Sequence, residues 1–166
     1  MKKAFTLLEL IISITLFMII VVFLYKTLDQ TKYSNNLFSN KQEILKQSNH
    51  LHNIFLEDIA EASSITIKSD KNKNAIVKIV TDNTYHNPFF NNITYFIGDT
   101  KKLIRIESKE VFNELETKNL DFYENAFIDI LLEDVEDFDV KNMEINYSFM
   151  IKQFNKDRIF YNAYRK

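Results

Sequence analysis

The chain has 166 residues, is 46% hydrophobic and 27% charged, and carries a formal net charge of −2 at pH 7. This charge balance argues against a broadly basic surface for binding nucleic acid. Because the chain has no cysteine, it cannot form disulfides, a Cys-based zinc site, a thiol nucleophile or a lipoprotein anchor.

A basic leader and an apolar run open the chain. Two lysines precede a stretch from Phe5 to Tyr25 that is apolar almost throughout. As a helix it would measure roughly 31 Å, enough to cross a hydrocarbon core about 30 Å thick. Glu9 interrupts this run, and an acid within a membrane segment is costly and usually functional. If the chain is cut after Ala4, the ammonium group of Phe5 shares a helix face with Glu9 and can pair with Glu9 of the same or a neighbouring helix.

The residues Lys3-Ala4-Phe5-Thr6-Leu7-Leu8-Glu9-Leu10 resemble the prepilin motif of type IV pilins and of type II secretion pseudopilins. The resemblance implies that residues 1–4 are a leader and that prepilin peptidase cuts between Ala4 and Phe5. It further implies that the new N-terminus at Phe5 is methylated and that Glu9 guides assembly into a filament. The family usually has glycine before the cut, whereas this chain has Ala4. We expect processing to survive this change because alanine is the next smallest residue.

Two other interpretations of the N-terminus remain. A cleavable secretory signal would need small residues at a cut site after the apolar run, and the run instead ends Phe23-Leu24-Tyr25-Lys26. An uncleaved signal anchor, in which Glu9 has no role, stays open.

Apolar residues continue at helical spacing beyond the membrane segment. They include Leu37, Ile44, Leu51, Phe55, Ile59 and Ala62. We therefore predict one helix to about Ala62, apolar over residues 5–25 and amphipathic over residues 26–62. Major pilins often have proline at the position of Lys26, so its absence favours a minor subunit.

The segment Phe55–Ala62 resembles the end of the stem in J-type minor pseudopilins and the related W-type minor pilins. Asp58 in this segment could pair with a base on the head or on a partner. From the sequence we favour the simpler interpretation that Asp58 is a solvated acid on the helix. We do not expect His50 and His52 to form a metal pair, because residues two apart on a helix point in different directions.

After the predicted helix, residues 63–166 have the alternating pattern of β-strands and predict a β-rich head. Strands are expected at 64–68, 75–81, 93–97, 102–107, 127–132, 144–151 and 158–161. Gly98-Asp99-Thr100 and Asn155-Lys156-Asp157 predict two hairpins, and residues 112–123 a polar connector that is partly helical. The 82–92 loop carries Phe89 and Phe90, which we expect to be exposed. The expected fold class is α+β: a long N-terminal helix packed on an antiparallel β-sheet head, as in pilins.

Several residues of the predicted head also resemble J-type and W-type heads. They are Tyr95, Leu103, Arg105, Val135, Phe138 and Val140. The K-type tip subunit typically lacks the motif glutamate, so Glu9 argues against that branch.

An acidic stretch is the weak candidate for a metal site. Its possible calcium ligands are Glu133, Asp134, Glu136, Asp137 and Asp139. Calcium is a plausible ion because some pseudopilins bind it, but no EF-hand-like loop is present and we favour a solvated strand edge protected by charge. No other cofactor is expected, and no catalytic constellation suggests an enzyme.

The sequence therefore predicts a minor pseudopilin of a type II secretion system, which is a protein transport machine. The protein would span the inner membrane once, with its head in the periplasm, and assemble into a pseudopilus or at its tip. Its expected partners are other pilins or pseudopilins through the N-terminal helix, prepilin peptidase and inner-membrane lipid, with no nucleic acid. A minor pilin for a type IV pilus or DNA uptake is the first alternative. A signal-anchored extracytoplasmic binding domain or enzyme is the alternative from another class.

Overall fold

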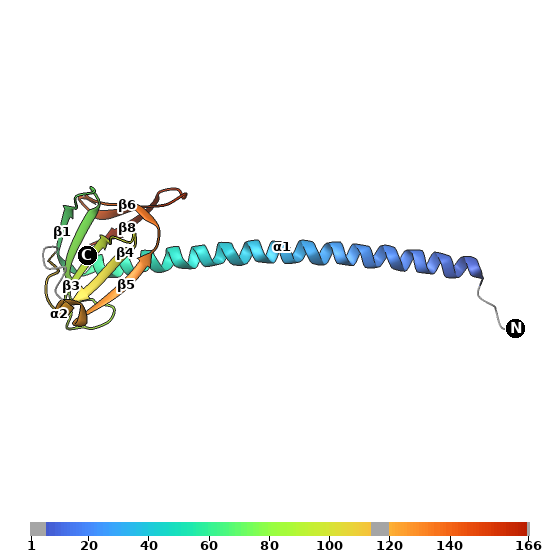
Figure 1. Ribbon diagram of the computed structural model, residues 1–166, viewed down its shortest axis with the longest axis horizontal. Helices are drawn as coiled ribbons and strands as arrows, with labels where there is room; N and C mark the ends of the chain where they lie inside the picture. The colour runs from blue at the N-terminus through green and yellow to red at the C-terminus, as the bar shows by residue number, and fades with distance from the viewer. Residues whose placement is uncertain (1–5, 114–119, 166) are drawn as a thin grey trace. The chain divides into compact units, whose positions relative to one another are not determined.

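The computed structural model describes residues 6–113 and 120–165. Its first element is the 54-residue helix α1, Leu7–Ala60, and a short helix, α2, spans Leu120–Glu124 (Figure 1). The strands are β1 (Ala62–Ser69), β2 (Ala75–Thr81), β3 (Asn92–Ile97), β4 (Leu103–Ser108), β5 (Ala126–Leu132), β6 (Val135–Met143), β7 (Asn146–Gln153) and β8 (Ile159–Tyr164). This α+β, pilin-like architecture confirms the predicted fold class.

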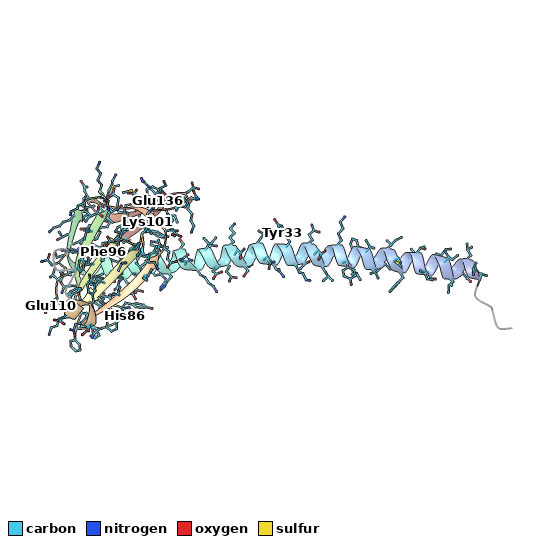
Figure 2. All side chains as sticks on the ribbon, viewed as in Figure 1. Tyr33, His86, Phe96, Lys101, Glu110 and Glu136 are labelled. Atoms are coloured by element: carbon cyan, nitrogen blue, oxygen red, sulfur yellow. The ribbon has the colours of Figure 1, made fainter. Side chains whose placement is uncertain are left out.

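The chain divides into two compact units after Gln47, and α1 contributes residues to both. No glycine or proline occurs between Leu7 and Ala60, so nothing in the sequence breaks the helical hydrogen-bond ladder. In the first unit every described side chain is exposed except Val21, which is half-buried. Tyr33, for example, is one of its exposed aromatic residues (Figure 2).

The second unit contains two antiparallel sheets. Strands β1 to β5 form one sheet in chain order, and β6, β7 and β8 form the other. Because neighbours in the sheets are neighbours in the chain, short turns connect most strands. In the turn between β3 and β4, the Gly98 N–H donates to the Lys102 carbonyl at 2.9 Å, and Lys101 has a left-handed φ of 57°. Strands β7 and β8 also pair antiparallel, and Asn155 in the turn between them has a left-handed φ of 55°, so both predicted hairpins are confirmed.

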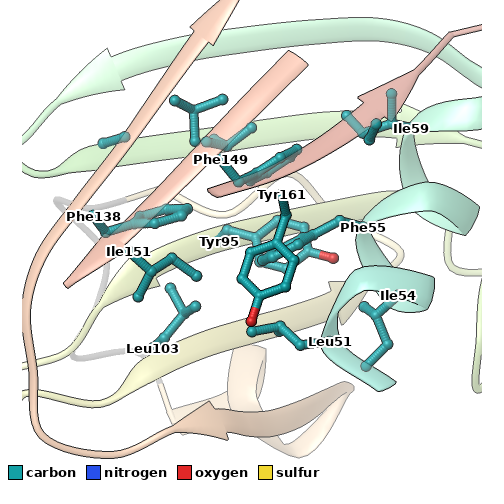
Figure 3. Close-up of a cluster of buried hydrophobic side chains, with 14 of the residues drawn as sticks. Leu51, Ile54, Phe55, Ile59, Tyr95, Leu103, Phe138, Phe149, Ile151 and Tyr161 are labelled. Carbon is teal, nitrogen blue, oxygen red and sulfur yellow. The ribbon is translucent and has the colours of Figure 1, made fainter. Parts of the chain in front are cut away.

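The last turns of α1 and both sheets enclose one core (Figure 3). Leu51, Phe55 and Ile59 are buried, and the Phe55 ring stacks on the Phe149 ring of β7 with centroids 4.2 Å apart. Burial of each such side chain stabilises the fold by about 1.5–3 kcal/mol. The apolar stripe predicted over the end of the helix thus covers the sheets as expected.

One sequence prediction about the head is wrong in detail, and two others agree with the structure. The acidic stretch, for which we favoured a solvated strand edge, is strand β6 at the edge of the three-stranded sheet. Phe89 is exposed as predicted, but Phe90 is half-buried and its ring packs 5.7 Å from that of Phe127. Helix α2 lies at the end of the connector that was predicted to be partly helical, and residues 114–119 of this connector are outside the described part of the chain.

Candidate functional site

Thr6 and Glu9 form a capping box at the start of α1. The Thr6 N–H and hydroxyl each donate to Glu9 Oε2 at 3.0 Å, and the Glu9 N–H donates to Thr6 Oγ1 at 3.3 Å. This reciprocal pattern satisfies backbone donors that have no partner within the helix, and the carboxylate lies at the positive end of the helix dipole. The sequence prediction missed the box, although its Thr-x-x-Glu signature can be read directly from the chain.

Hydroxyl groups along the apolar part of α1 are satisfied within the helix. Ser13 Oγ donates to the Glu9 carbonyl at 2.8 Å, and Thr15 Oγ1 donates to the Ile11 carbonyl at 3.0 Å. Such bonds remove the need for water, which is scarce within a bilayer. Among the described residues, α1 is the one helix long and apolar enough to cross a membrane.

A second cluster of charged side chains is buried in the head. Arg105 on β4 is 1% exposed, and it forms an ion pair with Asp58 in the last turns of α1. Its Nε donates to Asp58 Oδ2 at 2.8 Å and its Nη2 donates to Oδ1 at 2.9 Å, which is a bidentate ion pair. The Tyr95 hydroxyl on β3 also donates to Asp58 Oδ2. Asp58 is therefore not the solvated acid that we favoured from the sequence: it is 2% exposed, and that interpretation is wrong.

Two more carboxylates surround the same guanidinium. Arg105 Nη1 donates to Glu107 Oε2 at 3.0 Å and to Asp129 Oδ2 at 3.2 Å. The cluster thus holds three acids around one guanidinium, with His86 as its other basic group. His86 Nε2 lies 2.9 Å from both Asp129 oxygens. Sequence reasoning missed Glu107, because strand alternation alone does not mark a charged residue as buried. It also missed the pairing of half-buried Asp129 with exposed His86, because the two residues are 43 positions apart and only the fold brings them together.

Burial and charge pairing act in opposite directions on the pKa values of Asp58 and Arg105. Burial raises the pKa of Asp58 above its ordinary value, although the Arg105 guanidinium opposes the shift. Burial likewise raises the pKa of Tyr95. For Arg105, burial acts to lower the pKa, but hydrogen bonds and charge from Asp58 outweigh it and the pKa is raised. Arg105 therefore stays cationic, and the hydroxyl of Tyr95 stays a donor.

Glu107 also fixes the loop between β2 and β3. Its carboxylate is 0% exposed and accepts the backbone N–H groups of Tyr85, His86 and Asn87 at 3.1, 3.0 and 2.8 Å. The His86 ring (Figure 2) stacks on Phe127 of β5 with centroids 4.7 Å apart. The loop is thereby held against the sheet by a buried acid on one side and an aromatic contact on the other.

Comparison with known proteins identifies the N-terminal feature. Residues 1–25 match the family model described as the prokaryotic N-terminal methylation motif. This motif supports a type IV pilin-like protein. Such proteins are structural subunits of a pilus or pseudopilus, processed by prepilin peptidase and assembled with other pilins. No curated protein and no solved structure matches the chain.

The predicted cleavage residues Ala4 and Phe5 lie outside the described residues, which begin at Thr6. Cleavage between them, methylation of Phe5 and pairing of its ammonium group with Glu9 therefore stay predictions. The described part shows that Glu9 lies in the first turn of α1, where it is exposed.

The residues that carried the resemblance to J-type and W-type heads are all buried in the pilin-like head. Tyr95 and Arg105 bind Asp58 directly, and Leu103 lies on the same strand as Arg105. The other three, on β6, belong to the core: Val135, Phe138 and Val140.

The five candidate calcium ligands are spread along β6 and the turn before it. Glu133 pairs with Lys102 at 2.7 Å, which lowers the pKa of Glu133, and Glu136 pairs with Lys152 at 2.9 Å. Asp137 pairs with Arg158. Asp134 has a left-handed φ of 54° in the turn, and Asp139 is half-buried on β6. In residues 6–113 and 120–165, no group of three or more His, Asp or Glu side chains is arranged to hold a metal ion. Calcium binding stays a prediction.

The two histidines near the end of α1 have separate surroundings. His52 Nε2 lies 3.2 Å from the Asn162 carbonyl and its ring contacts Tyr161, whereas His50 is exposed.

Proposed function

We propose that this protein is a minor subunit of a type II secretion pseudopilus, similar to the J-type branch. It is made as a single-pass inner-membrane precursor with a periplasmic head. Prepilin peptidase cuts it between Ala4 and Phe5, Phe5 is methylated, and the subunit joins other pseudopilins through α1.

The observation that carries the choice of branch is the burial of Asp58 with Tyr95 and Arg105. These three residues come from two separate parts of the resemblance, the end of the stem and the head, and the fold brings them into one hydrogen-bonded cluster. Agreement between independent parts of the resemblance is stronger support than either part alone. Lys26, in place of the proline common in major pilins, supports a minor subunit.

The first unit provides the surface for assembly. Its apolar side chains between Leu7 and Leu45 are exposed, apart from half-buried Val21. In the membrane, lipid contacts this surface, and in a filament other α1-like helices replace the lipid. After cleavage, the ammonium group of Phe5 competes with Thr6 for the Glu9 carboxylate. If Thr6 binds the carboxylate, Glu9 caps its own helix; if the Phe5 ammonium of a neighbouring subunit binds it, Glu9 joins two subunits.

Deletion and complementation in the native host test the proposal. Loss of the chain should abolish export of the secreted proteins, with wild type restoring it and Glu9→Ala not restoring it. Intact secretion with loss of piliation or DNA uptake would instead identify a minor pilin of a type IV pilus. A Glu9→Ala variant that is processed and fully active would identify a signal-anchored binding domain or enzyme.

A further inference from the structure

Strand β5 is an open edge of the five-stranded sheet. Among the described residues its only ladder partner is β4, and the sheet order ends at β5. Ile128 and Ile130 are 46% and 56% exposed, and Phe127 is also exposed. The outer backbone groups of such a strand are ready to pair with another chain, so proteins usually protect edges with lysine, proline, bulges or a covering element.

The other edges of the head differ in their protection. Strand β1 has Lys68 and a register shift between Ala62 and Ser64, and β6 has four charged residues among its nine. At β8, Phe160 and Tyr164 are exposed, but the Asn162 carbonyl is already bonded by His52 of α1. The described part of the head therefore has two apolar edges, β5 and β8, and of the two β8 is the one that α1 contacts.

Protection on β5 itself is slight. The strand contains no lysine or proline, and its one charged residue, Asp129, turns toward Arg105 and His86. A bulge at Leu131 disturbs the pairing with β4, but it lies near the C-terminal end and leaves Ala126–Ile130 in regular register. Five residues in regular register span about 17 Å, the length of an ordinary strand.

Acidic residues flank β5 and limit what can pair with it. Glu124 precedes the strand and Asp134 follows it, and both are exposed. An antiparallel pair of two β5 strands centred on Asp129 would place Glu124 of one copy near Asp134 of the other, and Asp129 against Asp129. Like charges placed opposite one another are destabilising. A second copy of β5 is therefore a poor partner, and a strand with basic ends is a good one.

We propose that β5 accepts, as an added strand, an extended segment of a different pilin-like subunit, apolar at alternate positions and with lysine or arginine at its ends. This inference rests on the proposed role as a filament subunit. Main-chain hydrogen bonds to the open edge hold the segment, and alternate side chains contact Ile128 and Ile130 on one face and Phe127 on the other. The loop beside Phe127 is already fixed by Glu107, so little ordering is needed on binding.

The absence of cysteine makes the proposal directly testable, because a single introduced cysteine reports one position. Ile130→Cys marks the β5 edge, and Thr66→Cys, exposed on β1, is the matched control. The full chain is produced from its own locus, and whole cells are treated with a short cross-linker that carries one thiol-reactive maleimide and one amine-reactive ester, so that the introduced cysteine can be joined to a lysine of the partner segment. Ile130→Cys, but not Thr66→Cys, should give a heterodimer whose linked peptide is an apolar segment with basic ends in a protein that carries the prepilin motif.

Amide exchange provides the second measurement. The outer amides of β5 should exchange at least about tenfold more slowly in assembled material than in the detergent-solubilised chain, equivalent to about 1.4 kcal/mol. The double variant Ile128→Lys and Ile130→Lys should lose this protection and the cross-linked product, with an unchanged near-UV circular dichroism spectrum in detergent. Phe160→Lys, at an exposed position on β8, should keep both.

The outcomes separate this inference from the proposed function. If wild type copurifies with other pilin-like subunits but the β5 amides exchange equally before and after assembly, the added strand is refuted and the proposed function stands. A homodimer through Ile130→Cys refutes the choice of partner. If wild type copurifies with no pilin-like subunit at all, the proposed function fails and this inference fails with it.

Discussion

Replacement of Arg105 by methionine tests whether the charges of the head are buried together. In Arg105→Met, the carboxylates of Asp58, Glu107 and Asp129 keep their positions without the guanidinium that links them. Removal of one partner from a buried ion pair costs about 3–5 kcal/mol, because the remaining charge is left uncompensated. A domain is typically stable by only about 5–15 kcal/mol, so much of the stability of the head would be lost.

The loss can be measured on the full chain in detergent micelles by thermal unfolding, followed through tyrosine near-UV circular dichroism. At roughly 4 °C per kcal/mol for a domain of this size, Arg105→Met should lower Tm by about 10–20 °C. Asp58→Asn should cost less, about 1.5–3 kcal/mol, because it removes charge-assisted bonds but leaves the guanidinium with two acids.

The matched control is Arg158→Met, the same substitution at a surface ion pair. Arg158 pairs with Asp137, but its side chain is 47% exposed, and such pairs contribute about 0–1 kcal/mol. If Arg105→Met lowers the free energy of unfolding by no more than Arg158→Met does, the charges are not buried as described. If Asp58→Asn costs more than Arg105→Met, the guanidinium is not the group that holds the cluster together.

Three further predictions follow from the same contacts. Burial raises the pKa of Asp58 in the folded head, so as pH falls the folded state takes up a proton before the unfolded chain does. The free energy of unfolding of wild type, relative to that of Asp58→Asn, should therefore rise as pH falls from the raised pKa toward the ordinary 3.8. Urea titrations between about pH 7 and pH 4 measure this difference, and a decrease would contradict the shift. Glu107→Gln should speed amide exchange at Tyr85, His86 and Asn87 by about 10–100-fold, since bonds to a charged acceptor contribute about 1.5–3 kcal/mol, whereas Glu110→Gln at an exposed site should leave it unchanged. Phe55→Ala should lower the free energy of unfolding by about 3–5 kcal/mol and exposed Phe38→Ala by less than about 0.5; equal losses would show that Phe55 is not a core residue.

The helix and the strands were predictable because their signals are local. Before Gly98 the chain has no glycine and one proline, Pro88, and Leu51, Phe55 and Ile59 recur at helical spacing. Both signals depend only on nearby residues. The buried cluster is different, because Asp58 and Arg105 are 47 positions apart and meet only after β3 and β4 pair and α1 covers them. An acid on an amphipathic helix is usually solvated, so the local sequence pattern around Asp58 favoured an exposed side chain and not the buried one observed. The alternation of Leu103, Arg105 and Glu107 on one face of β4 was the available signal, and it acquires meaning only when the face is known to be buried.

The capping box changes how Glu9 should be understood. From the sequence, an acid in an apolar helix without a nearby base called for a positive chain terminus to offset its cost. The structure instead gives the Glu9 carboxylate two donors from Thr6 within the same chain, at the end of the helix where the dipole also favours negative charge. Glu9 therefore does not depend on cleavage for a partner. On the proposed cleavage after Ala4, the Phe5 ammonium would be a competing cation next to Thr6, and the free energy available to drive Glu9 toward another subunit would be the difference between an ion pair and a capping box. This difference would be smaller than the full cost of an unpaired acid.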